Sequence, residues 1–157
     1  DYLPVRSRFV SRAEVTRAGP WTEALGPGRV LVIERLMHIG EEFRLVSRIY
    51  VRPDVLPVFA ELPARKLDGE NFKDIMWRHA GQAIGPVRQF LSVIRLPDDV
   101  AKQVGVKRGT TGNHLQAIAW STGGTPLYFQ EFFIPPNGRR MHLPTSGRDP
   151  GLAPEGI

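Results

Sequence analysis

Apolar and polar residues alternate along six segments of this 157-residue chain, and each segment has the length of a β-strand. The segments lie at residues 3–16, 29–38, 43–51, 86–95, 113–121 and 126–134. Two pairs of them are joined by a short sequence that contains glycine, HIGEE in one pair and GGT in the other. A period of two on both sides of such a turn predicts two β-hairpins.

Four short stretches have helical character, at residues 20–25, 53–59, 71–81 and 97–105. In the third, Asn71 is placed as an N-cap, and Asp74 follows at capping-box spacing. In the fourth, Asp98 and Asp99 would stabilise the positive end of the helix dipole.

The helix and hairpin occur twice. Residues 31–40 read LVIERLMHIG and residues 115–124 read LQAIAWSTGG, with the glycine nine positions after the leucine in both. A helix-like stretch that ends in glycine precedes each copy, and an alternating strand that ends near a proline follows it. Hairpins require antiparallel pairing. The sequence therefore predicts an α+β fold, with a single antiparallel sheet of about six strands, short helices packed on it, and duplicated helix–hairpin units.

Length and composition favour one globular domain, at residues 1–144. Residues 145–157 have no periodicity, and we expect them to be disordered. The chain starts with Asp1 rather than Met, so we expect an upstream domain to be missing. No apolar run is long enough for a membrane span and no signal peptide is visible, which favours a cytoplasmic protein without membrane partners.

Cysteine is absent, so disulfides and thiolate metal sites are excluded. The net charge is +5, which raises the question of nucleic-acid binding. The basic residues are scattered, however, as in Arg6, Arg8, Arg12 and Arg139. A solvated basic surface is therefore favoured over direct DNA binding by this segment.

Two strands each carry one charge on an otherwise apolar face. Arg35 alternates with Ile33 and Met37, and Glu131 alternates with Phe129. A buried charge is costly unless it is paired and hydrogen-bonded. Either the two charges satisfy each other or a backbone group in the core, or they line a pocket. An arginine in a pocket suits a carboxylate or a phosphate.

Two further side chains are candidates. Arg48 is either a second contact for an anion or a solvated residue, and His114 is either a ligand contact or a structural residue. His38 lies by the first turn and is expected to be exposed. Histidine spacings typical of metal sites, the serine elbow, the Walker loop and GxGxxG do not occur, so we predict no metal, no cofactor and no catalytic set.

The run RVLVIERLMHIGEEFRLVSRIYV resembles the first hairpin of UTRA domains, the effector-binding domains of HutC-like regulators in the GntR family. The run DDVAKQVGVKRGTTGNHLQAIAWSTGGTPLYFQEFFIP resembles the second half of the same domain, and the similarity covers residues 23–143. The family is kin to chorismate pyruvate-lyase, with which it shares the α+β fold. The resemblance implies a sensor of a small, anionic effector that forms a homodimer. Operator DNA would be bound by an N-terminal winged helix-turn-helix domain, which is absent from this chain.

The resemblance also bears on the site. Arg35 is kept where phosphosugar-binding members often have Arg-x-Arg, but Met37 replaces the second arginine. These members often have a glutamate on the return strand of the hairpin. In this chain the equivalent position falls at Val46 or Ser47, so the carboxylate is missing. A pocket of Arg35, Met37, Tyr128 and Phe129 would suit a compact, partly apolar carboxylate. The candidate ligand-binding residues are Arg35, Met37, Ser47, Arg48, His114, Tyr128, Phe129 and Glu131.

Two alternatives stay open. In a chorismate pyruvate-lyase-like enzyme, Arg35 would hold a substrate carboxylate and Glu131 would contact the region of the ring hydroxyl. In a scaffold or assembly domain, the pocket would be vestigial. The helix and Gly-Thr pair before the second hairpin favour the regulator over the enzyme.

Overall fold

A computed structural model describes residues 3–69, 71–81 and 83–141 of the chain. Its strands are β1 (Val5–Val15), β2 (Val30–Ile39), β3 (Phe43–Val51), β4 (Ile84–Arg95), β5 (Thr111–Ser121) and β6 (Pro126–Ile134). Its helices are α1 (Thr22–Leu25), α2 (Val58–Glu61), α3 (Ala64–Leu67), α4 (Phe72–Ala80) and α5 (Asp98–Val104). The expected tail at residues 145–157 lies outside the described residues.

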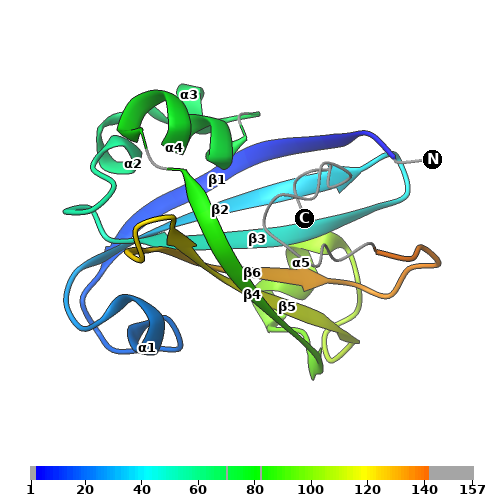
Figure 1. The fold of residues 1–157 in the computed structure, drawn as a ribbon. Coiled ribbons are helices and arrows are strands. Elements are labelled where there is room, and N and C mark those ends of the chain that lie inside the picture. Colours follow the sequence, from blue (N-terminus) through cyan, green and yellow to red (C-terminus); the bar gives the residue numbers. More distant parts are fainter. Residues whose placement is uncertain (1–2, 70, 82, 142–157) are drawn as a thin grey trace.

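The six strands form one antiparallel sheet in the order β1-β2-β3-β6-β5-β4 (Figure 1). Strands β1 to β3 and β4 to β6 are therefore two three-stranded units that meet between β3 and β6. In each unit a helix precedes the hairpin, α1 in the first and α5 in the second. The prediction of an α+β fold from duplicated helix–hairpin units is confirmed.

Glycine sets the turn of each hairpin. Gly40 and Gly124 both have positive φ, at 54° and 90°. Side chains with a Cβ rarely adopt this conformation. The sequence signal that predicted the hairpins thus reflects a backbone requirement at these two positions.

One expected helix is displaced. Instead of a helix at residues 53–59, the chain turns at Arg52–Leu56 and then forms α2 and α3, each of four residues. The residue before a proline is disfavoured in the α conformation, and here Leu56 precedes Pro57. The helix consequently starts only after Pro57.

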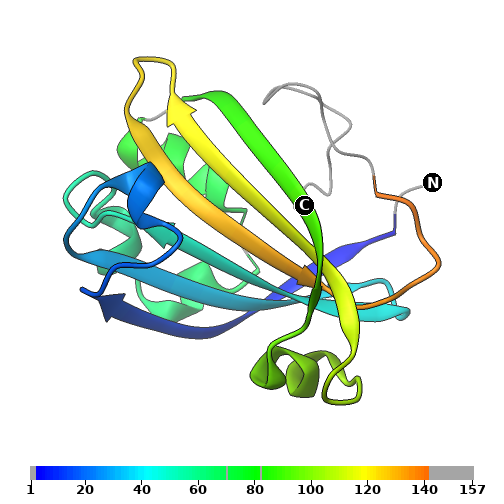
Figure 2. The same cartoon turned by 90° about the horizontal axis from the view of Figure 1, so that it is seen from below.

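Helices cover both faces of the sheet. Helices α2, α3 and α4 lie together on one face, which we call the α4 side, and α1 and α5 lie on the other, the α5 side (Figures 1 and 2). The helices of the two units cross over, because α1 packs against β6 and α5 packs against β3. This exchange ties the two halves together beyond the pairing of β3 with β6.

The core has apolar clusters on both sides. On the α4 side, Phe72, Ile75 and Met76 of α4 pack with residues such as Ile33 and Ile49 of the sheet. A second cluster on that side gathers around Met37, Leu45, Leu115 and Phe132. On the α5 side, Val100 and Val104 pack on Leu36, Val46 and Phe133, and Trp21 and Leu25 pack on Tyr50 and Phe129. Burying one such side chain contributes about 1.5–3 kcal/mol.

Candidate functional site

The strand register separates the two charges that sequence analysis placed on apolar faces. Arg35 is directly opposite Ser47 in β3, whereas Glu131 is directly opposite Arg48. Opposite residues of an antiparallel pair share a face, and successive residues of a strand point to opposite faces. Because Ser47 and Arg48 are successive, Arg35 and Glu131 lie on opposite sides of the sheet.

The eight candidate residues divide accordingly. The α4 side carries Arg35, Met37, Ser47 and Tyr128, and the α5 side carries Arg48, His114, Phe129 and Glu131. The single pocket expected from Arg35, Met37, Tyr128 and Phe129 does not form, and neither does a pair between Arg35 and Glu131. The substrate grip expected of a lyase-like enzyme also fails, because the sheet lies between its two charged groups.

Arg35 is a buried cation on the α4 side, with only 6% of its surface exposed. Its guanidinium carbon lies 3.6 Å from the ring centre of Phe72, the first residue of α4. Its Nη1 lies 3.4 Å from Oγ of Ser7 in β1. Burial lowers the pKa of Arg35 to about 10, which leaves the side chain charged at neutral pH. Such stacking on an aromatic face is favourable for an arginine.

Arg35 belongs to a line of polar side chains that crosses four strands. Ser7, Arg35, Ser47 and Gln130 lie on the α4 side of β1, β2, β3 and β6, and we call them the polar belt. Gln130 donates a hydrogen bond of 3.0 Å from Nε2 to Oγ of Ser47, which is fully buried. Along each strand the belt separates the apolar cluster under α4 from the cluster around Met37 and Phe132. A guanidinium, two hydroxyls and an amide in this setting suit an anionic or hydrogen-bonding group.

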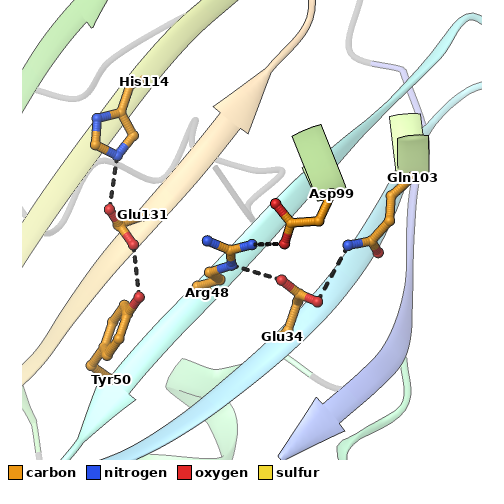
Figure 3. Close-up of polar contacts among 7 residues, drawn as sticks. All are labelled: Glu34, Arg48, Tyr50, Asp99, Gln103, His114 and Glu131. Atoms are coloured by element: carbon orange, nitrogen blue, oxygen red, sulfur yellow. Dashed lines mark hydrogen bonds and ion pairs between the residues drawn. The ribbon is translucent and has the colours of Figure 1, made fainter. Parts of the chain in front are cut away.

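Glu131 joins three strands on the α5 side (Figure 3). Its Oε2 accepts a hydrogen bond of 2.8 Å from the hydroxyl of Tyr50, and its Oε1 lies 3.0 Å from Nε2 of His114. Trp21 stacks on Tyr50, with ring centres 4.6 Å apart. Burial, together with the Glu131 charge, raises the pKa of Tyr50 well above its ordinary value. Since both carboxylate oxygens are engaged, this arrangement satisfies a buried carboxylate within the protein.

Arg48 is not solvated but lies in an ionic network on the same side (Figure 3). Its Nε donates to Glu34 at 2.7 Å, and its Nη2 donates to Asp99 of α5 at 2.8 Å. Gln103, also in α5, donates to the other oxygen of Glu34 at 3.3 Å. The network holds α5 on the sheet. It gives Arg48 one carboxylate partner in β2 and another in α5.

Sequence reasoning missed several members of these groups. Glu34 and Arg48 are equally far from the first turn, so the hairpin alone could have paired them. Asp99, Gln103 and Tyr50 carry no such local signal, because their partners come from another part of the chain. An open hollow on the described surface has a volume of about 370 Å³ and is lined by Arg29, Arg52, Pro53 and Asp54. It lies apart from all eight candidates.

Within residues 3–69, 71–81 and 83–141, no group of three or more histidine, aspartate or glutamate side chains is placed to hold a metal ion. In the same part of the chain, no helix is sufficiently long and apolar to span a membrane.

Comparison with known proteins gives a family match across the whole sheet. The model of the UTRA domain family matches residues 3–138. Among curated proteins, none matches the chain significantly.

Solved structures of low sequence identity share the fold. The ligand-binding domain of a protein assigned to the GntR family of transcriptional regulators in Bordetella bronchiseptica has a TM-score of 0.75 at 14% identity, with 90% of this chain and 91% of that one covered. A GntR-family transcriptional regulator from Enterococcus faecalis has a TM-score of 0.74 at 16% identity, with 88% and 99% covered. For YydK of Bacillus subtilis, described as a possible transcriptional regulator, the TM-score is 0.72 at 16% identity, with 89% of this chain covered. This chain spans 63% of the length of YydK.

Proposed function

This chain belongs to the UTRA domain family, and we propose that it is the effector-binding domain of a GntR-type transcriptional regulator. The observation that carries the proposal is the family match over residues 3–138, which includes all six strands. The shared fold with a domain described as ligand-binding supports it.

We place the effector on the α4 side, at the polar belt. Arg35 is the cation there, and Ser7, Ser47 and Gln130 supply hydrogen-bonding groups next to it. A guanidinium can hold a carboxylate or phosphate with two parallel hydrogen bonds. The apolar clusters on both sides of the belt favour an effector that combines one anionic group with an apolar body. The effector is thus a small organic anion.

Helix α4 is the element through which binding would act. Its first residue, Phe72, rests on the guanidinium of Arg35. An anion bound at the edge of the guanidinium offsets the charge that attracts the Phe72 ring to its face, so occupation of the site changes the stability of α4 against the sheet. A ligand shifts a conformational equilibrium by its differential affinity for the two states. Effector binding would in this way favour one position of α4.

The remaining parts of the proposal concern the whole regulator. Residues 1–144 form the sensor, and a separate winged helix-turn-helix domain binds operator DNA. The regulator is a homodimer that works in the cytoplasm, without a membrane partner. Strand β4 is a sheet edge with exposed Phe90, Leu91 and Val93, which gives a second copy an apolar strand to pair with.

A thermal-shift screen of the chain tests the effector proposal. The panel contains sugar phosphates, aromatic and heterocyclic carboxylates, amino-acid catabolites and chorismate. A ligand present at about 100 times its Kd adds roughly 2.7 kcal/mol to the free energy of unfolding. We expect a rise in Tm of several degrees for one class of organic anion. No shift across the panel would count against the proposal, and release of pyruvate from chorismate would establish the lyase-like enzyme instead.

Matched variants then locate the site. Arg35→Met keeps an unbranched apolar stem and removes the charge, so it should abolish the ligand-induced shift. Arg48→Met removes a partly buried cation on the opposite side of the sheet and should keep the shift. If Arg48→Met loses the shift and Arg35→Met keeps it, the effector binds on the α5 side.

A further inference from the structure

Two arginines and a histidine between them are aligned across the first unit of the sheet. Arg6 in β1 is directly opposite His38 in β2, and His38 is directly opposite Arg44 in β3. All three lie on the α5 side, and Arg8 lies on that side one pair further along β1. We call Arg6, Arg8, His38 and Arg44 the cationic row. His38, expected to be exposed at the turn, is instead a partly buried strand residue between two arginines.

Protonation of His38 is unfavourable in this alignment. Like charges directly opposite in a sheet are destabilising, and His38 stands opposite an arginine on each side. Burial and then the charges of Arg6, Arg44 and Arg8 lower the pKa of His38, while Glu41 acts in the opposite direction. Of the charges that shift the pKa of His38, those of the three arginines are cationic and that of Glu41 is anionic.

Some arginines of the described chain have anionic partners, whereas no ion pair within that part of the chain joins a carboxylate to others, such as Arg65 and Arg88. Arg29, Arg52 and Arg139 form ion pairs with Glu14, Asp54 and Glu42. Within residues 3–69, 71–81 and 83–141, no ion pair joins a carboxylate to Arg6, Arg8 or Arg44. Arg44 does pack close to the end of α5, where its Nη2 lies 2.6 Å from the position that a Cβ of Gly105 would take. Arg6 and Arg8 are exposed.

We propose that the cationic row binds the phosphate backbone of DNA. The proposal rests on the proposed function, in which this domain works beside a DNA-binding domain. Neighbouring strands are about 4.8 Å apart, so a row over three strands is roughly 10 Å long. One DNA strand presents a phosphate about every 3.4 Å along the helix axis, and such a row would face several of them. Arginine and protonated histidine recognise phosphates but do not read sequence.

The form of the row favours DNA over other anionic partners. Protein interfaces have an apolar centre. Here the apolar neighbours Leu36 and Val46 are buried beneath α5, and the accessible groups of the row are cationic. A small anion is bound by side chains that converge on one point, whereas these side chains are spread along a line at the margin of the sheet. A linear polyanion matches this arrangement.

Fluorescence anisotropy with the full 157-residue chain and a labelled duplex of arbitrary sequence tests the proposal. Contact with three phosphates predicts a salt slope of roughly −2.7, so binding should weaken about 40-fold between about 50 mM and 200 mM salt. Arg6→Gln combined with Arg8→Gln should remove most of the binding at low salt. Adding Arg44→Gln should remove the rest. Circular dichroism and a thermal melt show whether each variant stays folded.

The control has the same charge change elsewhere on the molecule. Arg65, Arg88 and Arg140 are exposed and lie outside the row, so their joint replacement by glutamine should leave binding within a few-fold of wild type. Equal losses in the row variant and this control would mean that only net charge matters, and the proposal would be wrong. Absence of binding by the wild-type chain at about 50 mM salt would also overturn it.

Two further measurements, a pH series and a phosphate series, distinguish a DNA contact from a small-anion site. Because burial and the neighbouring arginines lower the pKa of His38, the pH has to fall from about 8 to about 5 to protonate it. This change should strengthen DNA binding, and His38→Gln should flatten that dependence. Inorganic phosphate is added in a parallel thermal-shift series. If it stabilises the wild type but not the row variant, and the duplex does not bind, the row is a small-anion site and not a DNA contact. The effector screen contains no DNA, so its failure and the failure of this proposal are separate results.

Discussion

Arg35 and Glu131 lie on opposite faces of the same β-sheet, Arg35 under helix α4 and Glu131 on the side of α1 and α5. Both side chains are buried charges, but their contacts differ. Arg35 is stacked on Phe72 within a polar belt, whereas Glu131 has both oxygens occupied by Tyr50 and His114. The proposed effector site uses the first arrangement, and the second holds three strands together.

The bond from Tyr50 to Glu131 should be a measurable part of stability. A hydrogen bond to a charged group contributes about 1.5–3 kcal/mol, so Tyr50→Phe should lower the free energy of unfolding by an amount in this range. Glu131→Gln should cost a similar amount. Urea unfolding of both single variants and the double variant gives the coupling energy, which we expect at about 1–3 kcal/mol. A coupling near zero would mean that the bond contributes nothing.

The ionic network under α5 should depend on its two carboxylates to different degrees. The side chain of Glu34 is 14% exposed, and that of Asp99 is 66% exposed. Glu34→Ala leaves the partly buried Arg48 without its main partner and should cost about 3 kcal/mol. Asp99→Ala removes an exposed pair and should cost less than about 1 kcal/mol. Chemical denaturation compares the two, and equal losses would contradict the assignment of Glu34 as the main partner.

Tyr128 should make the fold sensitive to alkali. Burial raises the pKa of Tyr128 from 10.0 to about 12. Between these pH values the unfolded chain loses the tyrosine proton and the folded chain keeps it, so this contribution to stability is present below pH 10 and is lost as the pH rises. The loss is about 1.4 kcal/mol per pH unit for one group.

Comparison with Tyr128→Phe isolates this contribution, since the other titrating groups are the same in both proteins. Urea unfolding is measured at increasing pH. Between pH 10 and 12, the free energy of unfolding should fall more steeply for the wild type than for the variant. A constant difference over this range would show that the hydroxyl is not held in its neutral form by burial.

Gly112 should be required at the start of β5 for reasons of space. A Cβ at this position would clash with the carbonyl oxygen of Ile134 and touch the side chain of Leu96. Gly112→Ala therefore overpacks the contact between β5 and β6 and should cost about 1–3 kcal/mol. Gly138→Ala is the matched control, because a Cβ there meets no atom within 4 Å, and it should change stability by less than about 0.5 kcal/mol. Similar Tm values for both variants would contradict the steric argument.

The sequence by itself determined the local elements and the class of the fold. Period-two alternation located the strands, Gly40 and Gly124 marked the hairpin turns, and Asn71 marked the start of α4, where its side chain accepts a hydrogen bond from the amide of Lys73. These signals are local, because backbone conformation and capping depend on residues a few positions apart. The repeated helix–hairpin pattern added the antiparallel pairing.

Only the tertiary structure decided which charges meet. The pairing of β3 with β6 joins residues about eighty positions apart, as in Tyr50 and Glu131, and it placed Glu131 and Arg35 on different faces. The crossing of α1 and α5 brought Asp99 to Arg48, and the pairing of β1 with β2 aligned Arg6 with His38. Side-chain period fixes which residues of one strand share a face, but the register between distant strands depends on how all of the apolar faces are buried together.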